Sequence, residues 1–149
     1  MSLTMRFKRL PHAADMPAPK YMTEHAAGMD LYAACHEPIT INPGELKTVP
    51  TGLVIEIPPG FEGQIRARSG LALKHGLMLP NSPGTIDADY RGELMVILGN
   101  VSREPYSITR GMRFAQLIIC KVEHVGVEEV ADLSDTSRAS GGFGHTGTR

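Results

Sequence analysis

Short apolar runs recur along the chain, with turn-forming residues between them. The segments 53–57 and 94–98 each place an apolar residue at every second position, and 117–120 is apolar throughout. A period of two is typical of β-strands. Gly and Pro turn signals separate the runs, at Asn42–Gly44, Pro58–Gly60, Ser82–Gly84, Arg91–Gly92 and Arg110–Gly111. Short strands joined by such turns predict an all-β sandwich or barrel, of which the jelly roll is one form.

One segment has helical character, and the two ends differ from the middle. Ser69 is expected to cap a short helix through Leu71–His75, with Gly76 ending it. Residues 1–21 mix basic residues with prolines and lack the apolar centre of a signal peptide, so we predict an extended lead-in. From position 132 to 149 the chain is polar and rich in small residues, which predicts a mobile C-terminal arm. No repeat or second domain is visible, and we predict one domain over 1–149.

Composition narrows the classes of function. The 149 residues are 42% hydrophobic and 21% charged, enough for a core without disulfides. A net charge of -1 gives no general attraction to nucleic acids or membranes, so we expect neither as a partner. No apolar stretch approaches the roughly 20 residues that cross a bilayer. The two cysteines fit a reducing compartment, and we predict a cytoplasmic protein, although one disulfide is also compatible with the sequence.

A basic segment, Arg66–Gly70, stands just before the predicted helix. Helix N-termini attract anions, and Arg68 is able to hold phosphate oxygens through paired hydrogen bonds. An exposed strand end with solvated arginines explains the same residues. The segment alone leaves both interpretations open.

An acidic segment, Gly84–Glu93, contains three carboxylates around one tyrosine. A hydrolase that forms no covalent intermediate needs a carboxylate near the attacking water, and Asp87 or Asp89 would provide it. For an arbitrary pair of aspartates, an acidic turn between strands is the simpler interpretation.

The tail Arg138–Gly147 combines glycines with one aromatic residue. Closely spaced glycines allow backbone N–H groups to form an anion nest, and a base stacked on Phe143 would explain a ring without apolar neighbours. A disordered Gly/Ser linker is the alternative. No Cys/His cluster has metal-ligand spacing. We interpret five scattered histidines as ordinary surface or loop residues: His12, His25, His36, His75 and His124.

Taken in order, these segments resemble the five motifs of the trimeric dUTPase family. The motifs fall on Ala27–Ala33, Arg66–Ala72, Asn81–Gly92, Arg110–Leu117 and the glycine-rich tail. The resemblance implies a jelly-roll subunit and a homotrimer whose active sites are shared between subunits. It also implies hydrolysis of dUTP to dUMP and pyrophosphate, which limits uracil in DNA and supplies dUMP for thymidylate synthesis.

The resemblance assigns roles residue by residue. Asp87 falls on the general base, which activates a water for in-line attack on the α-phosphorus. Mg²⁺ would be held by substrate phosphates and water, without direct protein ligands. Asp30 would support the site. The substrate-binding positions are Arg68, Ser69, Gly70 and Gln116 for phosphates, Asn81, Thr85, Ile86 and Asp87 for uracil, Tyr90 for the sugar, Met95 in the pocket, and Arg138, Ser140, Gly142, Phe143, Gly144, His145 and Thr146 in the arm.

Three positions depart from the family pattern. Met112 replaces a polar residue, Ala139 replaces a glycine, and His145 stands where serine is usual. We expect Ala139 to restrict the backbone of the nest, and His145 to contact terminal phosphates.

Two alternatives come from other functional classes. A dCTP deaminase shares the fold, but its second motif is Ser-Ser-Ala-Arg-like and differs from Arg66–Gly70. A non-catalytic jelly-roll binder would not need Asp87 and Tyr90 together with the tail. Ammonia release from dCTP would identify the first, and dUTP binding without turnover the second.

Overall fold

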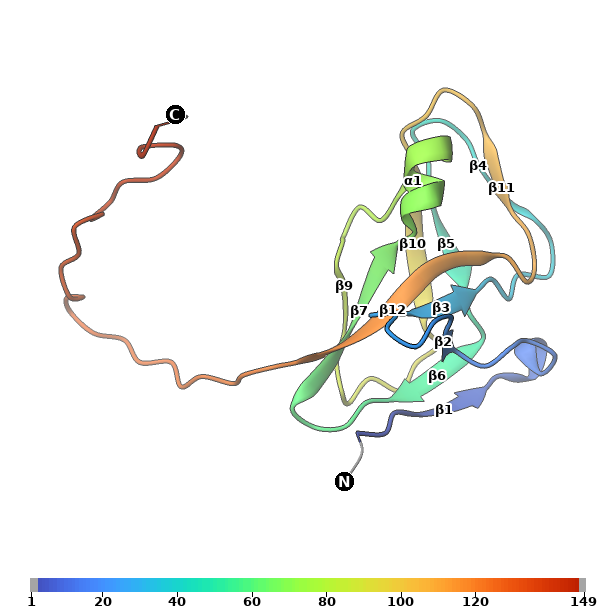
Figure 1. Ribbon diagram of the computed structural model, residues 1–149, viewed down its shortest axis with the longest axis horizontal. Helices are drawn as coiled ribbons and strands as arrows, with labels where there is room; N and C mark the ends of the chain where they lie inside the picture. The colour runs from blue at the N-terminus through green and yellow to red at the C-terminus, as the bar shows by residue number, and fades with distance from the viewer. Residues whose placement is uncertain (1–2, 148–149) are drawn as a thin grey trace.

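The computed structural model describes residues 3–147 and consists mainly of short β-strands (Figure 1). The described residues form one α-helix, α1 (Ser69–His75), and one 3-10 turn, η1 (Pro11–Ala13). The strands are β1 (Arg6–Arg9), β2 (Lys20–Tyr21), β3 (Met29–Tyr32), β4 (Ile39–Ile41), β5 (Leu46–Pro50), β6 (Leu53–Glu56), β7 (Phe61–Ala67), β8 (Leu77–Met78), β9 (Gly84–Ile86), β10 (Met95–Asn100), β11 (Tyr106–Ile108) and β12 (Arg113–Lys121). The all-β prediction is confirmed.

The largest sheet has five strands in the order β2-β3-β12-β7-β9. In it, β12 runs antiparallel to β7 from Ala115 opposite Ala67 to Lys121 opposite Phe61. Smaller sheets have the orders β5-β10-β8, β1-β6 and β11-β4. All strand pairs are antiparallel. The β12–β7 pair is the longest pairing in this sheet. The two parts of the candidate site lie near opposite ends of this pair.

The core follows the predicted alternation. Leu94, Val96 and Leu98 are buried, whereas Met95 is exposed. In β6 both faces are covered, because Val54 is buried together with its neighbours. The largest fully buried side chains come from the five-stranded sheet, the β5-β10-β8 sheet and the β11-β4 sheet, and they include Phe114, Leu31, Ile41, Leu98, Ile108 and Leu117.

The lead-in is more ordered than the predicted extended segment. Strand β1 pairs with β6, and η1 follows it. The turn packs so closely on Gly52, at φ +66°, that a Cβ there would lie 2.0 Å from the Cβ of Ala13. Arg110 Nη2 donates to the carbonyl of His12 at 2.8 Å and forms an ion pair with Asp15. The Pro-rich composition obscured a segment that is fixed by long-range contacts.

The helix confirms one predicted boundary and corrects the other. Gly76 ends α1 at φ +63°, and a Cβ there would meet the backbone nitrogen of Ser102 at 2.8 Å, so only glycine fits. Ser69, however, is the first helical residue and makes no capping hydrogen bond; Arg68 occupies the N-cap in an extended conformation. The serine therefore lies one residue too late to accept from the first turn.

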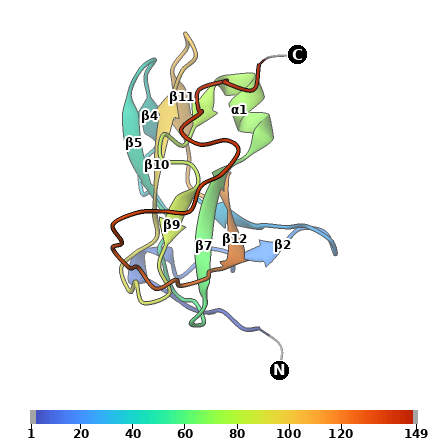
Figure 2. The same ribbon diagram turned by 90° about the vertical axis from the view of Figure 1, so that its left-hand side faces the viewer.

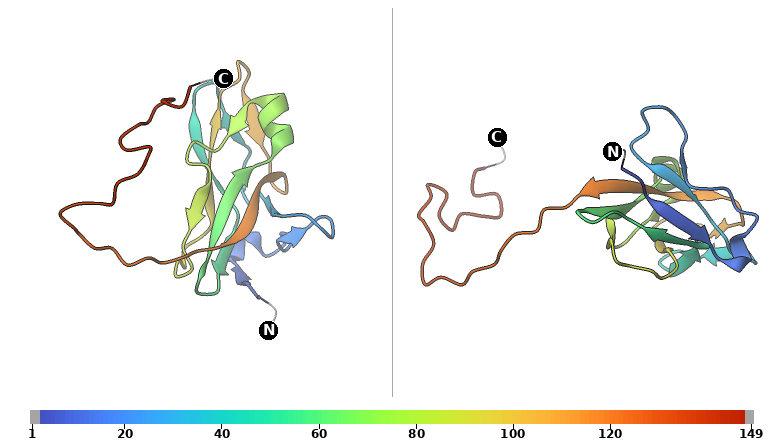
Figure 3. Two further views of the ribbon diagram at one scale, coloured as in Figure 1. Left: turned by 60° about the vertical axis from the view of Figure 1, so that its left-hand side comes forward. Right: turned by 90° about the horizontal axis from the view of Figure 1, so that it is seen from below.

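Beyond β12 the chain leaves the body of the domain (Figures 2 and 3). Residues 123–140 are exposed throughout and form neither strand nor helix. Among the described residues, both cysteines are free, with Cys35 buried. The described part of the chain also contains no helix long and apolar enough to cross a membrane.

Candidate active site

A pocket of about 400 Å³ lies where α1 begins, and we call it the arginine pocket. Antiparallel pairing of β12 with β3 places Gln116 opposite Asp30, and a bulge between Arg113 and Ala115 shifts the register beside them. The pocket is lined by Arg68, Ser69, Gly70, Asp30, Gln116, Arg113, Met22 and the segment Ala26–Gly28. Five predicted site residues thus come together from three elements.

Asp30 organises the charge in the arginine pocket. Its Oδ2 lies 3.0 Å from Arg113 Nη1, and its Oδ1 lies 3.8 Å from Arg68 Nε. Arg68 Nη1 also donates to the carbonyl of Arg113 at 2.9 Å. The Asp30 side chain is only 12% exposed, whereas those of Arg68 and Arg113 are 34% and 40% exposed. A buried carboxylate therefore fixes two guanidinium groups that keep donors facing the pocket.

Arg113 had no predicted role, although it belongs to the fourth motif. Its charge is opposite to that of Asp30, but the two residues lie 83 positions apart in the sequence, so no local pattern indicated the pairing. Gly28 also lines this pocket, and a Cβ at that position would be 2.8 Å from Gln116 Oε1. Gln116 Nε2 donates to the carbonyl of Ala67 at 3.2 Å, which holds the amide at the pocket rim.

A second pocket, of about 140 Å³, lies at the connection from β9 to β10, two strands that belong to different sheets, and we call it the hairpin pocket after the tight turn at Asp87–Tyr90. Its lining is Thr85, Ile86, Asp87, Tyr90, Glu93 and Met95. The turn that carries Asp87 is closed by a hydrogen bond from the Tyr90 amide to the Asp87 carbonyl, 3.1 Å. The Asp87 carboxylate is exposed and is available to a water or a ligand. Five of the predicted residues meet here, and Glu93 is an addition.

The side chain of Tyr90 folds back over the loop that joins β9 to β10. Its hydroxyl donates to the carbonyl of Glu93 at 3.0 Å. The ring lies over Gly92, where a Cβ would come within 2.3 Å of the hydroxyl oxygen. Glycine at this position thus permits the aromatic wall of the pocket.

The remaining predicted residues lie elsewhere. Asn81 does not line the hairpin pocket; its Nδ2 lies 3.4 Å from the position of a Cβ on Gly84, at the start of β9. From Thr136 onward, the hydrogen bonds found among the described residues join arm residues to one another, such as Arg138 Nε to the Gly141 carbonyl at 2.9 Å. Phe143 is fully exposed. The seven predicted arm residues therefore contact neither pocket of their own chain.

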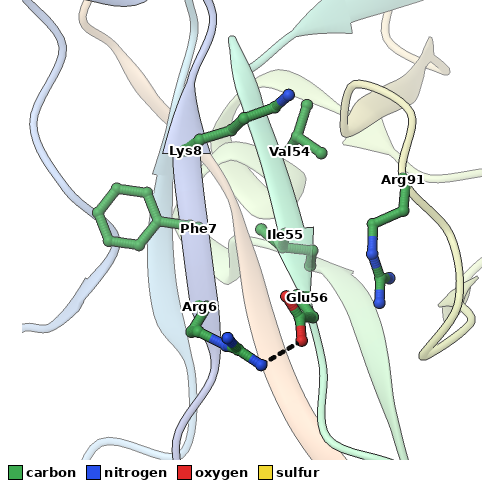
Figure 4. Close-up of a pocket in the computed structure, with 7 residues that line it drawn as sticks. All are labelled: Arg6, Phe7, Lys8, Val54, Ile55, Glu56 and Arg91. Atoms are coloured by element: carbon green, nitrogen blue, oxygen red, sulfur yellow. Dashed lines mark hydrogen bonds and ion pairs between the residues drawn. The ribbon is translucent and has the colours of Figure 1, made fainter.

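Two further pockets lie on the same domain. A groove of about 760 Å³ shares Thr85 and Asp87 with the hairpin pocket and extends past Asp89 and His124. Another pocket, of about 440 Å³, lies between β1, β6 and Arg91 (Figure 4). Figure 4 shows the ion pair that joins Arg6 to Glu56 across this pocket, 2.5 Å apart. None of the predicted site residues lines it.

His12 departs from the expectation of an ordinary surface residue. Its Nε2 lies 3.1 Å from Glu93 Oε1, with the side chains 29% and 24% exposed. It thus connects the lead-in to the hairpin pocket. The position of His12 in a Pro-rich segment gave no indication of this contact.

The fold and the two pockets define a jelly-roll enzyme that combines a carboxylate-bearing turn with a paired-arginine pocket. The dUTPase family model matches residues 14–147, and the chain belongs to the dUTPase family. The resemblance to dUTP-hydrolysing enzymes is thereby confirmed.

Known proteins similar to this chain agree with the family assignment. The deoxyuridine 5'-triphosphate nucleotidohydrolase of Caldanaerobacter subterraneus subsp. tengcongensis is 52% identical, with 99% of each chain covered. That of Rickettsia felis is 59% identical, with 87% of each chain covered. The dUTPase of Staphylococcus bacteriophage 80alpha, solved with dUPNHPP, superposes with a TM-score of 0.86 at 26% identity, covering 97% of this chain and 98% of that one. These matches disfavour the deaminase and the non-catalytic binder.

Proposed function

We propose that the chain hydrolyses dUTP to dUMP and pyrophosphate by attack of water on the α-phosphorus, with Asp87 as the general base. The water oxygen forms a bond to the α-phosphorus, while the bond to the oxygen bridging the α- and β-phosphorus breaks. Asp87 takes the proton from the water, and pyrophosphate leaves. This reaction keeps uracil out of DNA and supplies dUMP for thymidylate synthesis.

The observation that carries this proposal is the exposed Asp87 carboxylate beside Tyr90 in one small hairpin pocket. A general base must reach the proton that it takes, and a carboxylate at the pocket rim is suited to a water placed against a bound nucleotide. The narrow hairpin would accept uracil through backbone groups from Thr85 to Asp87, helped by Asn81 and Met95, and exclude a 5-methyl group. The ring of Tyr90 would pack on the sugar and exclude a 2'-hydroxyl.

The arginine pocket would hold the triphosphate. Arg68 and Arg113 present guanidinium donors whose geometry matches phosphate oxygens. Ser69, Gly70 and Gln116 line the same pocket and would add neutral donors. Asp30 would not touch the substrate but would keep both guanidinium groups in place.

The distance between the two pockets supports the sharing of sites between subunits. Ile86 pairs with Gly63 near one end of β7, and Arg68 lies five residues further along the chain. At 3.3 Å per residue this separates the pockets by about 17 Å. A nucleotide with its α-phosphorus at Asp87 would need phosphate donors closer than the Arg68 of the same chain. Together with the resemblance to the trimeric dUTPases, this distance leads us to propose a homotrimer in which a neighbouring chain supplies the arginine pocket.

The side chains of the arginine pocket indicate how Mg²⁺ would be held. The Asp30 carboxylate is engaged by two arginines, and the described residues contain no group of three His, Cys, Asp or Glu that would hold a metal. Mg²⁺ commonly keeps several waters and binds through substrate phosphates. These residues fit an ion carried by the triphosphate, where it would neutralise charge on the phosphate oxygens.

The arm would close over the nucleotide of another subunit. Phe143 is fully exposed and free to stack on uracil. Arg138, with backbone groups of Ser140, Gly142, Gly144 and Thr146, would grip the γ-phosphate, and His145 would contact the terminal phosphates. Closure of such a segment excludes water and completes a site.

Mixing two inactive variants tests both the reaction and the sharing. Asp87→Asn chains keep the arginine pocket, and Arg68→Ala chains keep the hairpin pocket. After co-refolding in equal amounts, about one site in four would combine both intact pockets if assembly is random. Recovery of dUTP hydrolysis to that level is expected. If the wild type hydrolyses dUTP but the mixture of the two variants stays inactive, a shared site is contradicted.

A further inference from the structure

Glu93 is bound on two sides, by groups far apart in the sequence. Its backbone carbonyl accepts the hydroxyl of Tyr90 at 3.0 Å. Its Oε1 accepts from the backbone nitrogen of Gly52 at 2.9 Å and lies 3.1 Å from Nε2 of His12. A carboxylate only accepts hydrogen bonds, so Nε2 carries the proton in this contact. One residue thus links the wall of the hairpin pocket to the lead-in.

The residues that contact the Glu93 carboxylate are closely packed and held by hydrogen bonds. The turn that carries His12 packs on Gly52, with almost no space between Gly52 and Ala13. Arg110 Nη2 donates to the His12 carbonyl at 2.8 Å, and Leu10 N donates to the Gly52 carbonyl at 2.8 Å. The two groups that hold the carboxylate are therefore fixed relative to each other. Glu93 is oriented by contacts that lie outside the five motifs, apart from Arg110.

Tyr90, in contrast, depends on its hairpin for its position. The residue is 44% exposed, and its ring lies over the backbone of Gly92, with the hydroxyl donating to the Glu93 carbonyl. Any rotation of the backbone at Glu93 moves that carbonyl, and the ring with it. We propose that His12 and Glu93 form a positioning pair that holds Tyr90 at the sugar and thereby sets the discrimination between deoxyribose and ribose nucleotides. The inference rests on the proposed role of Tyr90.

The pair acts through Tyr90 and not on the reacting atoms, so its loss should change selectivity more than turnover. The hairpin backbone from Thr85 to Ile86 is paired with β7 and does not depend on Glu93. Discrimination against a 5-methyl group should therefore persist when the pair is broken. A general loss of folding would instead lower activity on every nucleotide together.

The test compares kcat and KM for dUTP, UTP and dTTP in the wild type and in His12→Ala, Glu93→Ala and Glu93→Gln. Loss of one charge-assisted hydrogen bond corresponds to about a tenfold change. We expect the dUTP-to-UTP ratio of kcat/KM to fall about tenfold in both alanine variants, with the dUTP-to-dTTP ratio retained. Glu93→Gln keeps an oxygen acceptor and should recover most of the ratio. His36→Ala is the matched control, because its ring lies 5.9 Å from that of His12 and has no contact with Glu93 among the described residues.

Equal loss on dUTP and UTP in His12→Ala would overturn the inference, as would an unchanged ratio in both alanine variants. If Glu93→Ala fails to fold by circular dichroism, His12→Ala decides the question, because it leaves the Gly52 hydrogen bond to Glu93 intact. Absence of dUTP hydrolysis in the wild type would instead contradict the proposed function itself.

Discussion

Replacement of Asp30 by asparagine removes the charge at the centre of the arginine pocket while preserving the size of the side chain. In the structure, Asp30 makes one close ion pair with Arg113, at 3.0 Å, and one longer contact with Arg68, at 3.8 Å. Both arginines should lose orientation in the variant. The change therefore tests whether the carboxylate orients the two arginines or only lies beside them.

The expected loss of stability follows from exposure. A hydrogen bond to a charged group contributes about 1.5–3 kcal/mol. The side chains of Arg113 and Arg68 are 40% and 34% exposed, so both guanidinium groups regain water when the carboxylate is lost. That reduces the expected loss to about 1–2 kcal/mol, well below the 3–5 kcal/mol or so that follows when a fully buried pair is broken. The contact with Arg68 adds at most about 0.5 kcal/mol, because it lies beyond hydrogen-bond distance.

The assay is urea unfolding followed by circular dichroism, at one protein concentration because assembly would make stability depend on it. Asp30→Asn, Arg113→Gln and the double variant form a cycle that isolates the pair, and a coupling of about 1 kcal/mol is expected. The KM for dUTP should rise in Asp30→Asn as the arginines lose their orientation. Single effects that add to within about 0.3 kcal/mol would refute the organising role of Asp30.

Three further predictions concern other parts of the molecule. Gly28→Ala should displace Gln116, whose Oε1 would lie 2.8 Å from the new Cβ; a loss of about 1–2 kcal/mol in urea unfolding and a raised KM are expected, and unchanged values would contradict the close approach. The hydrogen bond from Arg110 lowers the pKa of Asp15 from its ordinary 3.8, so this pair stabilises the fold above that value and ceases to do so as pH falls through the folded pKa. Asp15→Asn should accordingly lose less stability than the wild type between pH 7 and about pH 3, and parallel pH curves would exclude the effect. Phe143→Ala should raise the KM for dUTP about tenfold through lost stacking, with little change in stability because the ring is fully exposed; an unchanged KM would exclude stacking on the base.

Local patterns predicted much of the fold. The alternation at 94–98 identified β10 and its buried side, and Gly76 ended the helix as expected. The lead-in escaped prediction because its order comes from pairing with β6 and from Arg110, about 100 residues away. Ser69 was misplaced by one position because the extended backbone continues through Arg68. Helix-cap preferences alone do not locate where a strand gives way to a helix.

The sequence motifs predicted the residues of the site. They did not predict the contacts that hold these residues in place. Motif order indicated Asp87, Tyr90 and Arg68, and the structure places the first two in one pocket and the third in another. The contact between Glu93 and His12 joins residues 81 positions apart, and neither residue type by itself indicates which residue it will contact. Such pairs depend on which strands become neighbours, and single-sequence patterns do not specify that.

Pyrophosphate release with Mg²⁺ tests the central claim most directly, with dUTP, UTP, dCTP and dTTP offered in parallel to the wild type, Asp87→Asn and Asp89→Asn. Asp89 is the matched control, because it lines the same outer groove as Asp87 but does not line the hairpin pocket. We predict release from dUTP in strong preference to the others, reduced at least about a hundredfold in Asp87→Asn and retained in Asp89→Asn. Full activity of Asp87→Asn, or equal release from all four nucleotides by the wild type, would contradict the proposed base and the proposed pocket.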